Sequence, residues 1–104
     1  MTTLHIVRES AFNTNDFFQC LQVLRNNDVI AFIDDGCYNV HHNLMDSLMD
    51  NIGRIDSDLS IKFAIIGQHA RARAIKINEE IYTKITMADL VSLSFENDRV
   101  ITWQ

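Results

Sequence analysis

The stretch that most constrains the fold is Val29-Ile30-Ala31-Phe32-Ile33, a continuous apolar run with polar residues on both sides. A strand that is apolar on both faces is typical of a parallel sheet covered by helices on each side. The turn Asp34-Asp35-Gly36 follows and ends the run. This stretch therefore predicts a buried strand at the centre of an α/β domain.

The rest of the chain alternates between strand-like and helix-like patterns. Further strands are predicted at residues 4–7, 61–66, 82–85 and 100–103. Helices are predicted at residues 17–24, 40–52 and 68–74, and from residue 86 onward. Alternating strand–helix–strand units predict a three-layer α/β sandwich. We expect a mostly parallel sheet of about five strands with helices on both faces, in a single domain spanning residues 1–104.

Three signals mark the ends of the predicted helices. Asn13 to Asn15 offer side-chain oxygens that can cap the first helix. Thr86 and Asp89 are spaced as a capping box, with Asp in place of the usual Glu. Gly53 is placed to end the second helix.

The charge of the chain argues against nucleic-acid binding. The formal net charge is −5, and the largest cationic group, Arg71/Arg73/Lys76, is too small to follow a phosphate backbone. No apolar run approaches the ~20 residues that span a bilayer, and the opening residues carry no secretory signal. We expect a cytoplasmic protein with two free thiols and no direct contact with nucleic acid or membrane.

The two cysteines are the candidate nucleophiles. Cys37 follows the acidic turn, where a helix N-terminus would lower its pKa and the charges of Asp34 and Asp35 would raise it. Cys20 lies on the apolar stripe of the first predicted helix, where a small core residue is the simpler interpretation. Each cysteine is either a reactive thiol or a buried bystander on this evidence.

Other signatures of enzyme chemistry are absent from the sequence. Cys37, His41 and His42 match no standard zinc spacing. There is no glycine-rich nucleotide loop and no local nucleophile motif. We therefore expect neither a metal nor a cofactor.

The chain is also rich in apolar side chains for its size. A domain this small buries only about two-thirds of its extended-chain surface. Some of this apolar surface therefore either meets another subunit or is ordinary scattered surface. The residues in question include Phe17, Phe18, Met45, Met49 and Trp103.

Four segments occur in a characteristic order: "LHIVRESAF", "DVIAFIDDGCYN", "HARARAI" and "KITMADLVSLSFENDRVITW". Their order, their spacing and the near-terminal Trp103 resemble the TusB/DsrH family of sulfur-relay subunits. Residues 40–60 match that family least. Ala72-Arg73-Ala74 has alanine where the family usually shows glycine.

The resemblance implies a DsrEFH-like fold and a role that composition does not indicate. Family members are cytoplasmic subunits of a heterohexamer of the DsrEFH/TusBCD type, together with TusC/DsrF-like and TusD/DsrE-like chains. The complex accepts persulfide sulfur and passes it to a small TusE/DsrC-like acceptor. In one branch the sulfur ends in 2-thiouridine at the tRNA wobble position, which is the role we expect here. The other branch serves dissimilatory sulfur oxidation.

The resemblance also bears on the candidate residues. It places the relay thiol in a sister chain, just past the third strand, where this chain has Ile66-Gly67-Gln68 and no cysteine. This chain is then a non-catalytic subunit, and Cys37 is incidental. Cys20 is the better sulfur-handling candidate, because relatives from sulfur oxidisers often carry a cysteine on this helix.

Two alternatives and one candidate surface remain. The first alternative to a relay subunit is a stand-alone persulfide sulfurtransferase that uses Cys20 or Cys37. The second is a self-associating α/β binding module without sulfur chemistry. Arg71 and Arg73 lie on a basic turn near the predicted strand ends. They either dock an anionic acceptor or a neighbouring chain, or they are a solvated turn.

Overall fold

The structure, a computed structural model, describes residues 2–52 and 60–103. Its elements follow one another as β1 (Thr3–Val7), α1 (Asp16–Gln22), β2 (Val29–Phe32), η1 (Asp34–His41), α2 (Asn43–Ile52), β3 (Lys62–Ile66), α3 (Gly67–Ala72), β4 (Tyr82–Ile85), α4 (Met87–Glu96) and β5 (Arg99–Trp103). Here η1 is a 3-10 helix and the other helices are α-helices.

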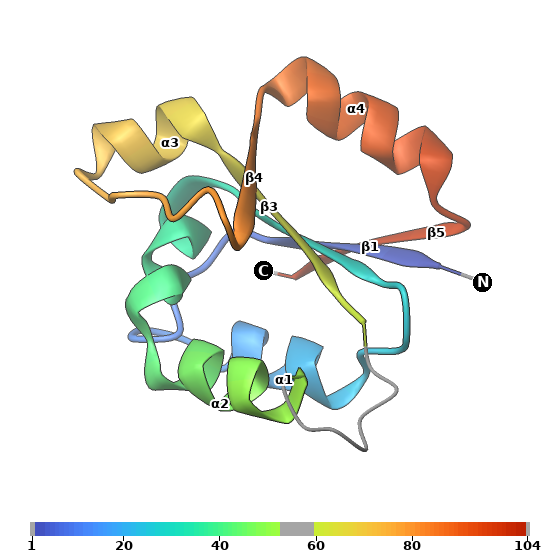
Figure 1. The fold of residues 1–104 in the computed structure, drawn as a ribbon, viewed down its shortest axis with the longest axis horizontal. Coiled ribbons are helices and arrows are strands. Elements are labelled where there is room, and N and C mark those ends of the chain that lie inside the picture. Colours follow the sequence, from blue (N-terminus) through green and yellow to red (C-terminus); the bar gives the residue numbers. More distant parts are fainter. Residues whose placement is uncertain (1, 53–59, 104) are drawn as a thin grey trace.

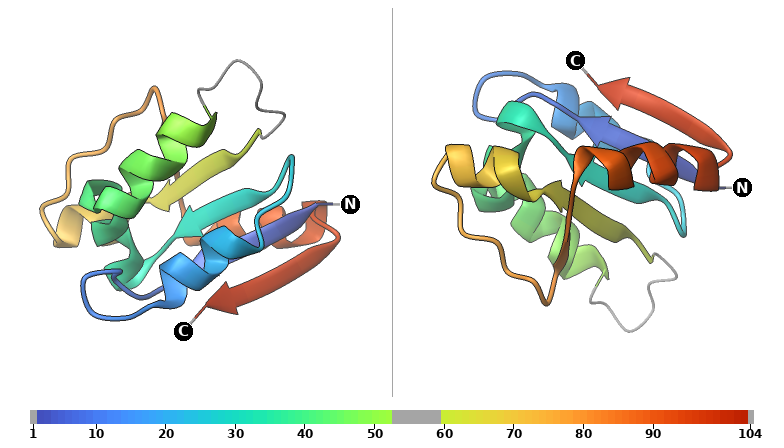
Figure 2. Two further views of the ribbon diagram at one scale, coloured as in Figure 1. Left: turned by 90° about the horizontal axis from the view of Figure 1, so that it is seen from below. Right: turned by 90° about the horizontal axis from the view of Figure 1, so that it is seen from above.

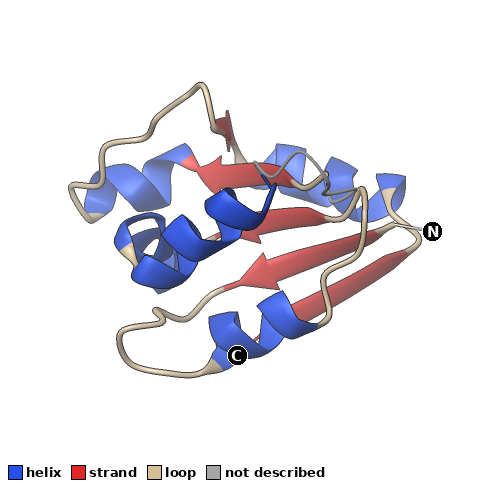
Figure 3. Cartoon of the chain, turned by 60° about the horizontal axis from the view of Figure 1, so that its bottom comes forward, coloured by secondary structure: helices blue, strands red, loops and turns tan. Residues whose placement is uncertain are grey.

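The strands form one five-stranded sheet in the order β4-β3-β2-β1-β5, with parallel pairing throughout (Figure 3). The predicted α/β class and parallel sheet are confirmed. Every residue of β2 is buried, as its unbroken apolar run requires. The chain steps outward from β1 to β4 and then returns across the sheet to place β5 beside β1.

The helices lie on both sides of the sheet and complete the predicted three-layer arrangement (Figures 1 and 2). On one face, the side chains of Ile30 and Phe32 pack with Phe17 of α1 and Met45 of α2. On the other face, Ala31, Ala64 and Ile85 of the sheet pack with Leu90 of α4. We call these the α1/α2 face and the α4 face. Alternate residues of β2 serve the two faces, because successive strand side chains point in opposite directions.

The chain from Asp34 to Ile52 differs from its prediction. Periodicity predicted one helix from Val40 onward, but the structure has η1 to His41, a break at His42 and then α2. His42 has an extended backbone, and its Nδ1 accepts a hydrogen bond from Leu44 N at 3.0 Å. The imidazole thus supplies an acceptor to the first turn of α2, a capping role that residue spacing does not reveal. The predicted cap at Gly53 lies outside the described residues.

The N-terminal caps predicted for the first and last helices are formed to different extents. Thr86 and Asp89 form the predicted capping box: Asp89 N donates to Thr86 Oγ1, and Thr86 N donates to Asp89 Oδ2. Of the three residues predicted to cap α1, Asn15 occupies the N-cap position but makes no side-chain capping hydrogen bond. The oxygen that the first turn uses is the Thr14 hydroxyl, which accepts from Asp16 N at 3.4 Å.

Candidate functional site

The carboxyl ends of the strands are where parallel sheets usually hold their sites, and the turn after β2 is built tightly against this edge. Gly36 N donates to Arg8 O at 2.9 Å and to Ile33 O at 2.8 Å. A Cβ at Gly36 would overlap the Val7 carbonyl, so no other residue fits without moving the backbone. The glycine of the "DDGCYN" motif therefore lets η1 approach the end of β1.

Asp34 adopts a left-handed backbone conformation, with φ of 48°. Aspartate tolerates this region better than most residues do. The Asp34 N–H donates to His69 Nδ1 at 3.0 Å, which ties the turn to α3. His69 was not among the residues singled out from the sequence, since nothing in its neighbourhood indicates a partner 35 residues away.

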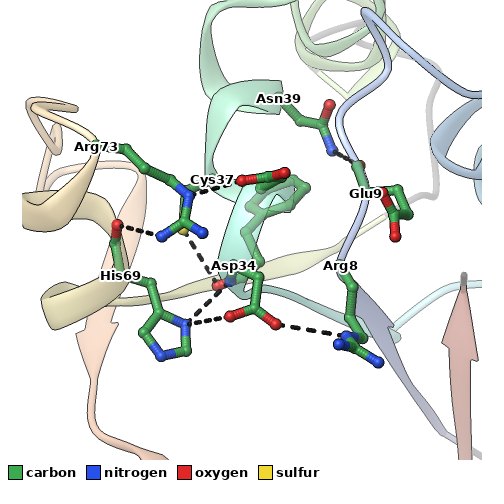
Figure 4. A network of polar contacts seen from close by, with 9 residues as sticks. Arg8, Glu9, Asp34, Cys37, Asn39, His69 and Arg73 are labelled. Atoms are coloured by element: carbon green, nitrogen blue, oxygen red, sulfur yellow. Dashed lines mark hydrogen bonds and ion pairs between the residues drawn. The ribbon is translucent and has the colours of Figure 1, made fainter.

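Charged side chains at this edge are paired with one another (Figure 4). Asp34 Oδ2 lies 3.4 Å from Arg8 Nε. His69 Nδ1 is 3.6 Å from Asp34 Oδ1, but it accepts the Asp34 N–H and so makes no ion pair with the carboxylate. Arg73 donates from Nε to Asp35 Oδ1 at 2.9 Å and from Nη1 to His69 O at 3.2 Å. The hydrogen bond to Asp35 raises the pKa of Arg73 above its usual value. These contacts connect β1, η1 and α3 into one network.

Cys37 lies behind this network, with its side chain fully buried. Burial raises the pKa of the Cys37 thiol to about 11; the nearby charge of Arg73 opposes the rise, while Asp34 and Asp35 add to it. Its Sγ lies 3.8 Å from Phe32 O, as a weak donor would. The position at the start of η1 does not activate the thiol, because loss of water around Sγ has the larger effect.

Cys20 is equally buried, in α1 on the α1/α2 face. Burial raises the pKa of its thiol to about 12, and the negative charge of Asp28 contributes to the rise. The structure therefore places both cysteines in the core, and neither thiol is exposed to a sulfur donor. Both remain free rather than bonded to each other.

A buried polar network lies on the same side of the sheet as Cys20. His5 and Asp28 are 1% and 2% exposed, and His5 Nε2 lies 3.0 Å from Asp28 Oδ2. Trp103 Nε1–H donates to His5 Nδ1 at 3.1 Å, so neutral His5 carries its proton on Nε2 and donates it to Asp28. Asp28 also accepts from the backbone of Thr3 and Arg25. The near-terminal tryptophan is thus part of a structural network that joins β5 to β1 and β2.

Arg71 and Arg73, which the sequence analysis considered together, occupy different surroundings. Arg73 is held in the network around Asp35. Arg71 is exposed and lines an open cleft at the end of β3 with Lys76 and Lys84. Within residues 2–52 and 60–103, Arg71 makes no side-chain hydrogen bond or ion pair. Only Arg71 of the two is available to an anionic partner.

The described residues contain neither a metal-binding cluster nor a membrane-spanning helix. In the described ranges, no three His, Cys, Asp or Glu side chains gather closely enough to hold a metal ion. No helix in the part of the chain that the structure describes is both long and apolar enough to cross a membrane.

Comparison with known proteins identifies the family. The family model described as "DsrH like protein" matches residues 9–100, which include the turn after β2, α3 and α4. The chain belongs to the DsrH-like family. The resemblance inferred from the sequence is confirmed, and the DsrH-like chain is a subunit of a sulfur relay. Among curated proteins, the comparison finds no match.

The family resemblance implies that a sister chain carries its relay thiol at the position of Ile66-Gly67-Gln68. Gly67 is the first residue of α3, directly after β3. A Cβ at Gly67 would lie 2.8 Å from Lys84 Cγ, so the lysine stem packs over the glycine. In this DsrH-like chain the end of β3 therefore carries a glycine that is covered by the Lys84 side chain.

Proposed function

We propose that this DsrH-like chain is a non-catalytic subunit of a cytoplasmic sulfur-relay heterohexamer, with TusC/DsrF-like and TusD/DsrE-like chains as its partners. In that assembly a sister chain carries the persulfide and passes its sulfur to a TusE/DsrC-like acceptor. The observation that carries the proposal is the burial of both thiols in a chain of this family.

The chemistry of persulfide transfer supports this reading. A thiolate attacks the outer sulfur of a persulfide, a new sulfur–sulfur bond forms, and the donor leaves as a thiolate. The attacking group must be deprotonated and accessible. Cys20 and Cys37 are neither, because burial excludes the donor and raises both pKa values to about 12 and about 11.

For the pathway, we propose 2-thiolation of the tRNA wobble uridine. The alternative, a DsrH-type subunit in dissimilatory sulfur oxidation, was favoured by Cys20 on the first helix. In the folded chain that cysteine is fully buried and packs with Phe17 in the core. Its burial therefore argues against a sulfur-handling role for Cys20. The same burial removes the support that a reactive Cys20 would give to dissimilatory sulfur oxidation.

An exposed apolar surface supports the proposed assembly. Met87, Val91 and Phe95 lie four residues apart on α4 and are 48%, 55% and 84% exposed. Spacing of four residues places them on one side of the helix. Val100, on the neighbouring edge strand β5, is 43% exposed. Exposed apolar side chains gathered on one side of a helix are typical of a subunit contact.

The first test is intact mass after sulfur loading. The purified native chain is incubated with a cysteine desulfurase, cysteine and a small persulfide carrier protein, and the chain in urea with inorganic polysulfide, beside the variants Cys20→Ala and Cys37→Ala. We expect no added sulfur in the native chain and sulfur addition in urea, where both thiols are exposed. Stoichiometric loading of the native chain that disappears in one variant would establish a sulfurtransferase with that cysteine as its nucleophile.

The second test concerns the partners. The chain is co-expressed with DsrE-like and DsrF-like chains and purified through a tag on this subunit alone. We expect all three chains in equal amounts, and sulfur transfer to the acceptor only when the sister thiol is intact. A tagged chain that elutes alone, or only with copies of itself, would instead favour a self-associating binding module.

A further inference from the structure

Two adjoining cavities lie beyond the carboxyl ends of β3 and β4. The first, of about 420 Å³, is lined by Gly67, Arg71, Ala74, Ile75, Lys76, Ile77, Glu79 and Lys84. The second, of about 360 Å³, is lined by Ile66, Gly67, Gln68, Arg71, Lys84, Ile85 and Thr86. Arg71, Lys84 and Gly67 line both, and we call this combined feature the basic cleft. Most of its lining residues belong to α3, the loop after it and β4, which can be followed in Figure 1.

The rim of the basic cleft is cationic on a protein whose net charge is −5. Arg71, Lys76 and Lys84 face a single carboxylate, that of Glu79. Arg71 and Lys76 have no ion pair among the described residues. Lys84 Nζ lies 3.6 Å from Glu79 Oε1, but both side chains are more than half exposed, so this pair is weak. The cleft thus holds more positive charge than its own residues neutralise.

The backbone keeps the cleft open. Gly67 has no side chain, which lets the stem of Lys84 cross the end of β3. At the other side, Ala74 has a left-handed backbone with φ of 55°, and Ile75 N donates to Ala70 O at 2.9 Å. This turn ends α3 and sends the chain along the far wall of the cleft. Buried Ile75 and half-buried Ile77 on that wall add an apolar lining.

We infer that the basic cleft binds an acidic segment of a partner protein, in which carboxylates flank an apolar side chain. The guanidinium of Arg71 matches the planar geometry of a carboxylate, and Lys76 and Lys84 supply further charge. The isoleucines of the wall take up the apolar side chain. Nucleic acid fits less well, because phosphate tracking needs a longer basic surface than three cations on an acidic protein. The inference does not depend on the proposed sulfur relay.

The ion pair between Glu79 and Lys84 shows that the basic cleft attracts a carboxylate. A carboxylate from the protein itself already occupies the vicinity of Lys84. A partner carboxylate competes with this exposed pair, which costs little to break. Removing the charge in Glu79→Gln should therefore tighten binding of an acidic ligand about twofold to threefold.

The test uses a short fluorescent peptide of alternating glutamate and leucine, with a glutamine–leucine peptide as its neutral control. Binding to the full chain is followed by anisotropy and by amide chemical shifts at about 50 mM salt. We expect saturable shifts around residues 67–77 and 84, and a loss of affinity as salt rises. Equal binding of the neutral peptide, or no saturable shift in these amides, would overturn the inference.

Charge reversals locate the site. Arg71→Glu and Lys76→Glu change exposed side chains that have no ion pair among the described residues, so folding should be unaffected. Together they should weaken peptide binding at least about tenfold. Lys62→Glu makes the same change in charge as each single reversal, but at the opposite end of β3, and should leave affinity within about twofold. A short single-stranded RNA that binds more tightly than the peptide and competes with it would replace the acidic segment by nucleic acid.

Discussion

The two faces of the sheet differ in how completely helices cover them. The α1/α2 face is covered by two helices and contains the fully buried Phe17, Phe32 and Cys20. The α4 face is covered chiefly by one helix and leaves Phe95 84% exposed. The α1/α2 face therefore supplies most of the buried contacts of the fold, and the proposed assembly would place a partner against the exposed side of α4.

The largest expected effect on stability comes from truncating a buried side chain on the α1/α2 face. Phe17 is fully buried and lies edge-on to Phe32, with ring centroids 5.5 Å apart. Phe17→Ala should cost about 3–5 kcal/mol of unfolding free energy, since it removes a buried ring and leaves a cavity. Urea denaturation followed by circular dichroism measures this loss.

A chain that loses this much stability can fail to fold. Phe17→Leu keeps most of the volume and should cost no more than about 1.5 kcal/mol, so that it remains measurable. If Phe17→Ala costs less than about 1 kcal/mol, the α1/α2 face is not the stabilising one and the comparison between the faces fails.

The next largest effect is expected from a change in the buried polar network of His5, Asp28 and Trp103 on the α1/α2 face. Trp103→Phe keeps an aromatic ring beside His5 but removes the Nε1–H that donates to His5 Nδ1. A buried acceptor without its donor costs about 1–3 kcal/mol. Urea midpoints of the variant and the wild type give the difference. Val100→Ala, on the same strand but 43% exposed, is the control and should cost about 0.5 kcal/mol or less. Equal losses would show that the indole N–H contributes nothing specific.

A smaller effect should appear at high pH. Burial raises the pKa of Cys20 to about 12 and of Cys37 to about 11, whereas an unfolded thiol titrates near ~9. The unfolded chain therefore releases these protons first, and stability falls as the pH rises from about 9 toward 11 and 12. Between about pH 7.5 and pH 10, each thiol should cost on the order of 1 kcal/mol.

The control for this pH effect is the double variant Cys20→Ala/Cys37→Ala. Its stability at neutral pH can differ from that of the wild type, so the quantity to compare is the change between the two pH values. We expect a visibly flatter response in the double variant. An identical slope in both proteins would mean that the thiols are accessible to water in the folded chain.

The smallest effect on stability is expected for a substitution on the exposed side of α4. Phe95→Ala changes the same residue type as Phe17→Ala, but at an exposed position on α4, and should alter the unfolding free energy by less than about 0.5 kcal/mol. Its effect should appear in co-purification with the related subunits, where the recovered fraction of partner chains falls. A loss of stability above about 1 kcal/mol would indicate that Phe95 packs within its own chain, contrary to the comparison.

Much of the architecture follows from local pattern. The apolar run at residues 29–33 predicted a doubly covered strand, and β2 is buried along its whole length. The strand at Tyr82–Ile85 and the capping box of Thr86 and Asp89 also match their predictions. These features depend on residues a few positions apart, so their physical causes are already present in a short stretch of sequence.

The candidate site depended on contacts that no short stretch contains. The pairing of Asp34 with His69, and of Trp103 with His5, joins residues 35 and 98 positions apart. Arg71 and Arg73 are nearly adjacent and chemically identical, yet Arg73 bonds to Asp35 and Arg71 lines an open cleft. Their separation comes from the orientation of α3 against η1, which is a property of the packed chain.

Sequence alone thus determined the alternation of strands and helices and the parallel sheet, because apolar periodicity and local capping decide them. The family followed from a resemblance carried by the order and spacing of four segments. The tertiary structure decided the state of the two thiols and the accessibility of the charges. Whether Cys37 is a reactive thiolate depends on water around Sγ and on charges brought close by folding, and both are set only when η1, α3 and the sheet pack together.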